Sequence, residues 1–298
     1  MYLKTDAASL QVYEALASEV RLKIIDKLFI KEMHIKELAA ELYLSSAIVS
    51  SHVNKLEQAG LVGSQMKRVN GGTYKFCYAN TEYLQIKLSP ERKNSYKEVS
   101  VPIGHYTDYE AWPTCGIATI EKVIGHYDNP TYFMDPGRVD AGILWLAKGF
   151  VEYKVPNYLL KDDQLREVEI SFEIGSEAPQ YNENWPSDIC FTLNDQLLGT
   201  WTSPGDYGET RGKLTPEWWS SDVNQYGLLK VLRITDNGTY VDGQRLSDVC
   251  IHHLRVDPKY WTFRISAEDT GRGRGGLTLY GKGFGNYDQD ILMKYYYE

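Results

Sequence analysis

The hydrophobic and polar positions of the chain follow two different patterns, one before about residue 80 and one after about residue 100. Over residues 11–16, 19–29 and 35–42, apolar residues recur every three or four positions, which predicts amphipathic helices. The face of the second helix that should be buried carries Leu22, Ile25, Leu28 and Phe29. The third helix should bury Ile35, Leu38, Ala39 and Leu42.

The stretch LSSAIVSSHVNKLEQAGLV, residues 44–62, predicts a fourth helix with defined ends. Ser45 is a suitable N-cap because its hydroxyl oxygen can accept a free amide proton of the first turn. Gly60 stands where a left-handed residue commonly ends a helix. The predicted inward stripe consists of Val49, Val53 and Leu56.

A helix pair followed by a basic hairpin has the order of a winged helix-turn-helix domain. Two strand-like runs, 61–67 and 73–79, are joined by RVNGG, whose Asn-Gly pair is typical of a tight hairpin. In such a domain the second helix of the pair lies in the major groove of DNA, and hairpin cations reach the phosphates. The predicted DNA-binding residues are Ser46, Ala47, Ser50, Ser51, Asn54, Lys55, Lys67, Arg68 and Lys75.

This part of the chain resembles the ArsR family of bacterial transcriptional regulators. The resemblance rests on ALASEVRLKIIDKL, on IKELAAELYLSSAIVSSHVNKLEQAGLV and on the hairpin, within residues 8–80. It implies a regulator that binds double-stranded operator DNA, usually as a repressor, with activation left open. Proteins of this fold commonly dimerise on two-fold sites, and residues 2–17 are expected to provide a dimer helix.

Two departures from the family pattern change what the resemblance implies. Metal-sensing members carry a C-x-C pair just before the helix-turn-helix, where this chain reads MHIKEL, with His34 and no cysteine. The resemblance therefore implies no soft-metal sensing there, and we expect neither a metal nor a cofactor. Ser51 stands where the family often has a basic residue, so the helix is expected to read DNA through short polar groups. The electrostatic affinity must then come from Lys55 and the hairpin cations.

Beyond about residue 101 the pattern changes to short runs of strand character. Residues 166–174 alternate strictly, with apolar Val168, Ile170, Phe172 and Ile174 on one face and polar residues on the other. Further runs are 150–155, 189–193, 228–234, 261–267, 276–280 and 291–297. Many short strands separated by turns predict a jelly-roll-like β sandwich. The expected chain is multidomain α+β, with a winged helix-turn-helix over 1–88, a linker over 89–100 and a β-sandwich effector-sensing domain over 101–298.

The charges are distributed unevenly between these two parts. The chain has a net charge of −8, but residues 1–88 hold 11 Lys and Arg against 9 Asp and Glu, whereas residues 89–298 hold 21 against 31. The acidic part argues against nucleic-acid binding over the whole molecule and leaves room for a small DNA-binding head.

The chain shows no sequence signal for a membrane or for secretion. No apolar run approaches the roughly 20 residues that cross a bilayer, and the first residues lack the apolar core of a signal peptide. We therefore expect a cytoplasmic protein that does not bind membranes. The four cysteines form no C-x-x-C pair and are expected to be reduced and mostly buried.

Aromatic residues of the second part cluster in segments rich in Gly and Pro, especially over 182–188 and 199–219. Trp and Tyr beside Asp, Glu and Arg are typical of sugar recognition, in which rings stack on the sugar and polar groups bind its hydroxyls. The expected ligand is thus a small effector, with a sugar as the favoured kind. The predicted effector-binding residues are Trp185, Trp201, Asp206, Tyr207, Glu209, Arg211, Trp218 and Trp219.

Two alternatives stay open for the second part, and a third is disfavoured. It could dock a protein partner, or it could be a carbohydrate-active enzyme that uses a pair of its many carboxylates. Carboxylates are plentiful on any acidic surface, and the sequence gives no distance between them. We therefore name no catalytic residue and do not expect an enzyme. A metal site at His252 and His253 is disfavoured because adjacent residues on a strand point to opposite faces.

Overall fold

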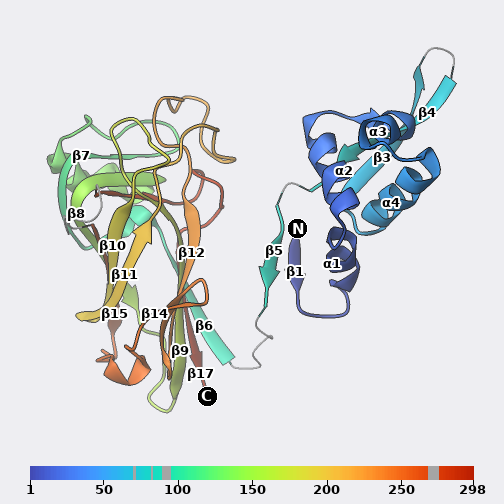
Figure 1. Cartoon of the computed structure of the whole chain (residues 1–298). Coiled ribbons are helices and arrows are strands. Elements are labelled where there is room, and N and C mark those ends of the chain that lie inside the picture. Colours follow the sequence, from blue (N-terminus) through green and yellow to red (C-terminus); the bar gives the residue numbers. More distant parts are fainter. Residues whose placement is uncertain (70–71, 82, 89–94, 268–274) are drawn as a thin grey trace. The chain divides into compact units, whose positions relative to one another are not determined.

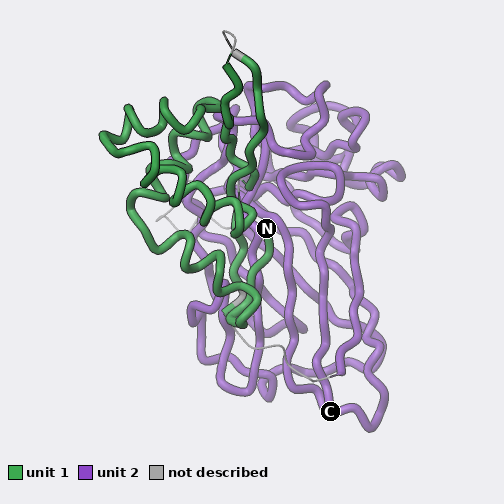
Figure 2. Tube along the Cα trace, turned by 90° about the vertical axis from the view of Figure 1, so that its right-hand side faces the viewer, with its two compact units in different colours: residues 1–93 green, residues 94–298 purple. Residues whose placement is uncertain are grey.

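The computed structural model describes residues 1–69, 72–81, 83–88, 95–267 and 275–298. These residues belong to two units, Met1–Lys93 and Asn94–Glu298, which we call the head and the body (Figure 2). None of the helices in these ranges is long and apolar enough to cross a membrane.

The head consists of four short helices and a three-stranded antiparallel sheet (Figure 1). Strand β4 lies in the middle of that sheet, between β2 and β3. A separate parallel pair, β1 with β5, joins the start of the head to its last part. The elements are β1 Tyr2–Lys4, α1 Leu10–Leu16, α2 Glu19–Ile30, β2 Met33–His34, α3 Ile35–Leu42, α4 Ser46–Gln58, β3 Val62–Val69, β4 Gly72–Ala79 and β5 Gln85–Lys87.

Helix α2 is where it was predicted, but its buried face differs from the predicted one. Ile24 and Leu28 are buried, whereas Leu22 and Phe29 are about half exposed, at 45% and 50%. The reason is Arg21, which is turned inward and donates from Nε to the carbonyl oxygen of Ala15 at 2.6 Å. Its Nη2 donates to the carbonyl oxygen of Glu14 at 2.7 Å, so Arg21 satisfies carbonyls at the end of α1.

Helix α4 confirms the predicted caps and stripe. The Ser45 hydroxyl accepts the amide proton of Ile48, with 3.3 Å between the heavy atoms. Gly60 has a φ of +72°, and the amide of Leu61 reaches back to the carbonyl of Leu56, which is the pattern of a glycine-terminated helix. The stripe of Val49, Val53 and Leu56 has no exposed surface.

The predicted dimer helix over residues 2–17 is wrong as a single helix. Residues 2–4 are strand β1, and helix α1 begins only at Leu10. The turn between them is built by Ser9, whose amide donates to Oδ1 of Asp6 and whose hydroxyl accepts the amide proton of Lys4. Local polar contacts of this kind compete with helix formation, and the parallel pairing with β5 holds the first residues extended.

The body is a mainly antiparallel β structure with short 3₁₀ turns. Its elements are β6 Ser95–Val101, η1 Ile103–His105, β7 Asp108–Ala118, η2 Pro130–Met134, η3 Pro136–Asp140, β8 Ile143–Pro156, β9 Leu165–Gly175, β10 Ser187–Leu193, β11 Gln196–Ser203, β12 Leu228–Thr235, β13 Gly238–Val241, β14 Gln244–Ser247, η4 Ile251–His253, β15 Tyr260–Ala267, β16 Leu277–Tyr280 and β17 Ile291–Tyr297.

These strands form two layers. Strands β7, β8, β15, β10 and β11 make one layer, and β6, β17, β9, β12, β13 and β14 make the other. Strand β16 connects the layers, since it pairs with residues 143–146 of β8 on one side and with the end of β9 on the other. The predicted fold class, a winged helix-turn-helix followed by a jelly-roll-like β sandwich, is confirmed.

The main core lies between the two layers. The ring of Phe172 in β9 contacts those of Phe191 in β10 and Phe263 in β15, with centroids 5.4 and 5.8 Å apart. Trp261 of β15 stacks on Tyr295 of β17 at 5.5 Å. The predicted inward face of β9, Val168 to Ile174 in alternation, is fully buried.

The polar face of β9 is less exposed than strict alternation suggests. Glu167 is 1% exposed and binds the guanidinium of Arg233 through both carboxylate oxygens. Glu173 has no exposed surface, because the segment around Gly285 covers it. The sandwich therefore carries a second, polar interior on the far side of β9.

The predicted linker over 89–100 overlaps the body. Residues 95–100 belong to β6, which pairs antiparallel with β17 along its whole length. Residues 89–94 lie outside the described part of the chain.

Candidate DNA-binding face and effector region

Helix α4 presents a row of short polar side chains to solvent. Ser46, Ala47, Ser51 and Asn54 are exposed, and Ser50 is partly exposed. The buried stripe of α4 packs into the head core and leaves this opposite side free, as the amphipathic pattern predicts. Ile48, which the sequence reasoning did not include, is also 47% exposed between these polar positions.

The four predicted cations fall into two groups. Lys75 Nζ lies 2.6 Å from Oε2 of Glu57, and Lys67 is ion-paired with Glu32. Lys55 and Arg68 are exposed, and no ion pair of either is found in the described part of the chain. Lys55 and Arg68 are therefore the cations most available to DNA phosphates.

Glu57 connects α4 to the hairpin. Its carboxylate accepts the Ser64 hydroxyl proton from β3 and the Lys75 ammonium from β4. Lys75 also lies 3.4 Å from Oδ1 of Asn54. The sequence could not indicate this role, since it depends on the spatial approach of the hairpin to the helix. The tip of the hairpin, residues 70–71, lies outside the described residues.

His34 has a structural position. Its Nδ1 accepts the amide proton of Glu37 at 3.2 Å and so caps α3. Its ring stacks on Tyr74 and meets Phe76 edge-on, with centroids 5.2 and 5.5 Å apart. These contacts fix helix α3 against the hairpin.

In the body, two of the predicted effector segments lie against each other. The backbone of Asn182 pairs with that of Asp206, and the backbone of Tyr207 with that of Tyr226. The rings of Tyr207 and Tyr226 stack with centroids 5.3 Å apart. The amide of Glu209 approaches Oε1 of Glu183 at 3.4 Å. Residues 182–183 and 206–209 therefore lie together, with Glu209 exposed and Tyr207 partly exposed, whereas the predicted effector residue Asp206 has no exposed surface.

Three predicted effector residues have contacts within the protein instead. Trp219 is only 2% exposed and packs in a second core with Trp145 and Phe284. Arg211 donates to the carbonyl oxygens of Pro216 at 2.5 Å and Trp219 at 3.0 Å, so it closes its own loop. Trp201 packs against the main core, and the Lys230 ammonium lies 4.9 Å from its ring centroid. Trp185 is partly buried.

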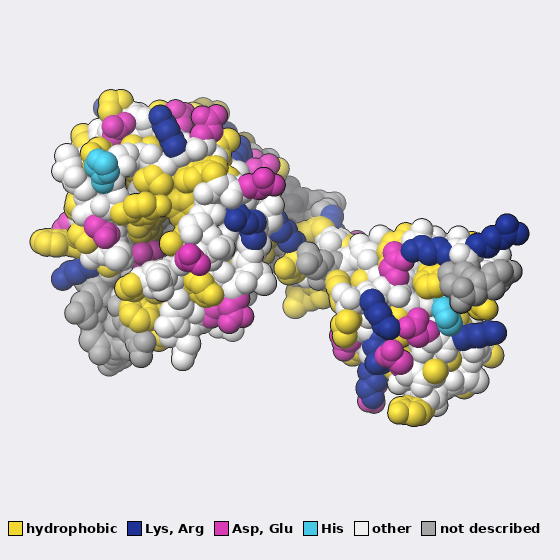
Figure 3. Space-filling model, turned by 90° about the horizontal axis from the view of Figure 1, so that it is seen from above, with side chains coloured by type: hydrophobic (Ala, Val, Ile, Leu, Met, Phe, Trp, Pro, Cys, Tyr) yellow, Lys and Arg dark blue, Asp and Glu magenta, His cyan; other side chains and the backbone are white. Residues whose placement is uncertain are grey.

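Four rings form a continuous row, which we call the aromatic row: Tyr127, Trp145, Trp219 and Trp218. Successive ring centroids are 5.7, 5.7 and 5.5 Å apart. The inner two rings are buried, whereas Tyr127 is 55% and Trp218 41% exposed. Trp218 Nε1 donates to the carbonyl oxygen of Ile120 at 2.6 Å, which fixes its ring. Figure 3 shows hydrophobic side chains gathered on a face of the body, with charged side chains around them.

Sequence reasoning found only half of this row. Trp145 lies in the apolar run ILWLA, which reads as an ordinary core strand, and Tyr127 lies in a short turn. Their approach to Trp219 depends on the connection between β7 and β8, for which no local signal exists.

Three buried carboxyl groups lie near the predicted effector segments. Glu173 accepts amide protons from Gly227 at 2.8 Å, Asn286 at 2.9 Å and Tyr287 at 2.9 Å. Burial still raises the pKa of Glu173 to about 7, although these amide donors lower it. Gly285 has a φ of +70°, and a Cβ there would overlap the Glu173 carboxylate, so only glycine fits.

Glu177 and Asp206 form a close pair of such groups. Burial raises the pKa of Asp206 to about 8. The hydrogen bond that the Ala178 amide donates to Oδ2 of Asp206 lowers this pKa, but its effect is smaller. Burial, and then the charge of Asp206, raise the pKa of Glu177 well above its ordinary value. Oδ1 of Asp206 has no hydrogen-bond partner among the described residues. The protonated form of Asp206 is therefore favoured at neutral pH, and burial favours the protonated form of Glu177 as well.

The head has the features of one class of protein. A capped helix with an exposed polar face, a bracing helix before it and a hairpin beside it define a winged helix-turn-helix DNA-binding domain. Residues 18–64 match the family model of the bacterial regulatory proteins of the arsR family. The N-terminal third is thus an ArsR-type winged helix-turn-helix, a fold that supports a role in DNA-binding transcriptional regulation.

Several solved structures are similar to part of the chain. Reduced HlyU from Vibrio cholerae N16961 is 29% identical, with 25% of this chain and 75% of that chain covered and a TM-score of 0.23. NolR from Sinorhizobium fredii is 27% identical over 25% and 70% of the two chains, with a TM-score of 0.22. The CBM36-1 domain of a multidomain xylanase from the hindgut metagenome of Trinervitermes trinervoides is 9% identical over 67% and 96%, with a TM-score of 0.30. No curated protein sequence matches the chain.

Proposed function

We propose that the protein is a homodimeric cytoplasmic repressor whose body binds a small carbohydrate effector without catalysis. The observation that carries the DNA-binding part is the family match over residues 18–64, which contains the exposed polar face of α4. The effector part is supported by the exposed ends of the aromatic row.

In this proposal α4 enters the major groove. The hydroxyls of Ser46, Ser50 and Ser51 and the amide of Asn54 would contact base edges or phosphates, and Ala47 would contact an apolar base edge. Lys55 and Arg68 would supply most of the phosphate contacts, since the ammonium groups of Lys67 and Lys75 already bind carboxylates.

Operator binding by two copies follows from the geometry of such domains. A two-fold dimer places two recognition helices in successive major grooves, about 34–36 Å apart. Tyr2 and Leu10 are each 52% exposed at the start of the head, and apolar side chains of this kind gain stability when a second copy covers them. We therefore place the contact between copies at β1 and α1.

The exposed rings of Trp218 and Tyr127 would stack on the apolar faces of a sugar. The buried rings of Trp219 and Trp145 contact them and limit their movement, so little side-chain entropy is lost on binding. Polar groups of the predicted effector segments, among them Glu209, would pair with sugar hydroxyls. Binding would shift DNA affinity if the effector prefers one of two states of the regulator.

The DNA-binding and effector parts are tested separately. Selection of DNA sites from a random double-stranded pool should enrich one sequence with two-fold symmetry. A panel of sugars should include at least one that raises the melting temperature of the body, followed by tryptophan fluorescence. All seven tryptophans lie between residues 112 and 261, so this signal reports on the body alone.

Matched variants distinguish the aromatic row from other exposed rings. Trp218→Ala should abolish the sugar-induced shift, whereas Trp112→Ala should keep it. Trp112 is 55% exposed but lies outside the row, with Nε1 bound to Glu110. A body that no sugar stabilises would contradict the effector proposal, and turnover of a sugar would replace it by the enzyme alternative. Neither result would affect the DNA-binding part.

A further inference from the structure

The four cysteines of the chain differ sharply in their surroundings. Cys77 and Cys115 have no exposed surface, and burial raises the pKa of each thiol to about 11, so both are poor nucleophiles. Cys190 and Cys250 are partly exposed, and all four are free thiols. The sequence-based expectation that the cysteines are mostly buried therefore fails for Cys190 and Cys250.

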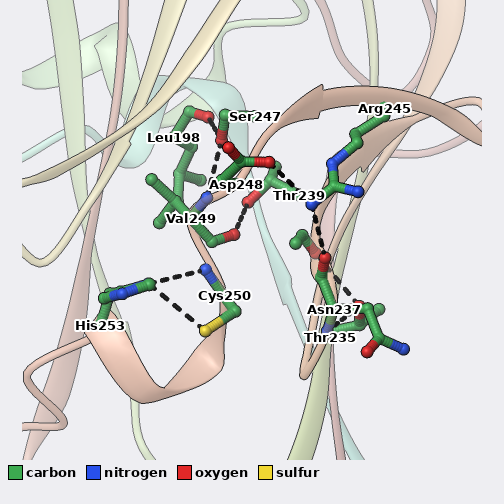
Figure 4. Close-up of polar contacts among 11 residues, drawn as sticks. Leu198, Thr235, Asn237, Thr239, Arg245, Ser247, Asp248, Val249, Cys250 and His253 are labelled. Atoms are coloured by element: carbon green, nitrogen blue, oxygen red, sulfur yellow. Dashed lines mark hydrogen bonds and ion pairs between the residues drawn. The ribbon is translucent and has the colours of Figure 1, made fainter.

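Cys250 differs from Cys190 in having an imidazole beside its sulfur. The Cys250 Sγ lies 3.3 Å from Nδ1 of His253 (Figure 4). The Cys190 Sγ lies 3.2 Å from the Thr200 hydroxyl, which cannot serve as a base. His253 is exposed, so both the thiol and the ring can be reached from solvent.

The local backbone holds the thiol and the ring together. The Cys250 amide donates to Nδ1 of His253 at 3.0 Å, and the His253 amide donates to the Cys250 carbonyl oxygen at 3.0 Å. Nδ1 is therefore an acceptor, and a neutral ring carries its proton on Nε2. Ile251 and Leu254 on either side are buried in the main core.

The segment before Cys250 is attached to both layers of the sandwich. The Ser247 hydroxyl donates to the carbonyl oxygen of Leu198 in β11 at 2.5 Å, and the Thr239 hydroxyl of β13 donates to that of Val249 at 2.7 Å (Figure 4). The pair of thiol and imidazole is thus presented on a fixed turn.

We propose that Cys250 is a reactive thiol, activated by His253, that forms a mixed disulfide with small-molecule disulfides. His253 Nδ1 takes the thiol proton and in doing so releases the Cys250 amide proton that it accepts beforehand, and the Cys250 sulfur attacks one sulfur of the incoming disulfide. The new S–S bond forms as the old one breaks, and the leaving thiolate takes the proton from the imidazolium. The small disulfide is the oxidant and is reduced to one thiol, so atoms and electrons balance.

Metal binding explains the same pair less well. Among the described residues, no three His, Cys, Asp or Glu side chains converge to hold an ion. The neighbouring His252 has its Nε2 3.5 Å from Oδ1 of Asp236. Thiol chemistry needs only the two groups that lie together.

The experiment measures the reaction rates of single thiols in the full chain. Cys190→Ser leaves Cys250 as the reactive thiol, and Cys250→Ser leaves Cys190. Each variant is mixed with 5,5′-dithiobis(2-nitrobenzoate), and separately with cystamine, and the modified residue is identified by peptide mass. We expect Cys250 to react at least about tenfold faster than Cys190 with both reagents, as positioned base catalysis allows.

Variants of the two histidines, made in the Cys190→Ser background, test the role of the base. In His253→Asn, the side-chain amide oxygen can still accept the Cys250 amide proton, but it cannot take up the thiol proton. The reaction rate of Cys250 should therefore fall about tenfold or more. His252→Asn should change it less than about twofold, because the structure places that ring on Asp236. An unchanged tryptophan-fluorescence melt shows that His253→Asn is folded.

Three results would overturn the proposal. They are equal rates for Cys250 and Cys190, an unchanged rate in folded His253→Asn, and an equal loss of rate in both histidine variants. Reaction of Cys250 with the aromatic reagent but not with cystamine would also overturn it, because the proposal concerns small disulfides in general.

Discussion

Asp206→Asn should stabilise the body, and the gain should grow with pH. The pKa of Asp206 is raised from an ordinary 3.8 to about 8 by burial, so the folded protein keeps a proton that the unfolded chain releases. Between these two values the unfolded state binds fewer protons than the folded state, and stability falls as pH rises. Asn carries no proton to lose, and the variant lacks this dependence.

The size of the effect follows from proton linkage. One proton kept only by the folded state lowers stability by about 1.4 kcal/mol per pH unit. The difference between variant and wild type should therefore grow by about 1 to 3 kcal/mol from pH 5 to pH 7. The Asn oxygen can accept the Ala178 amide proton as Oδ2 does, and its NH₂ group replaces the oxygen that has no partner among the described residues.

The assay is urea unfolding of the full chain followed by tryptophan fluorescence at several pH values, which reports on the body. Groups other than the Glu177–Asp206 pair contribute nearly equally to both proteins, so the difference isolates that pair. The reasoning would be refuted by a variant that is less stable than the wild type by the same amount at every pH. It would also be refuted if the wild type became more stable relative to the variant between pH 5 and pH 7.

Two further predictions concern the head. Arg21→Met should destabilise the head by about 2 to 3 kcal/mol, measured from the helical circular dichroism signal, because two charged hydrogen bonds to the end of α1 are lost; a loss no greater than that of exposed Arg68→Ala would contradict this role. The double variant Lys55→Ala, Arg68→Ala should reduce the slope of log K against log salt by about 2 per head, whereas Lys75→Ala should reduce it by much less, since Lys75 is already paired. Fluorescence anisotropy with a selected DNA site measures the slope for the wild type and both variants. An equal change in slope for each cation removed would contradict the distinction.

The sequence predicted best those features that local patterns determine. The caps of α4, its inward stripe and the alternation of β9 depend on spacing within one element, and the structure confirms them. The inward turn of Arg21 was missed because an arginine in an amphipathic helix is ordinarily on the solvent side. What decides its position is the nearby end of α1, which no helical pattern of α2 contains.

The effector region was predicted less well, for a related physical reason. Composition indicates that aromatic and polar residues are abundant there, but burial decides what each can do. Trp218 and Trp219 are adjacent in sequence, yet one is 41% exposed and the other belongs to a core. Glu173 looked like an outward residue of an amphipathic strand and is instead covered by a loop from the far end of the chain.

The central claim, that the head binds operator DNA through α4, is tested most directly by a charge placed on that helix. Ser51→Glu adds a negative charge to its exposed face, and Gln244→Glu adds the same charge to the exposed strand β14 of the body. On a DNA site selected by the full chain, Ser51→Glu should weaken binding by about tenfold or more, and Gln244→Glu by less than about twofold. Equal affinities of the two variants, or a random pool from which the wild-type chain selects no site, would contradict the claim.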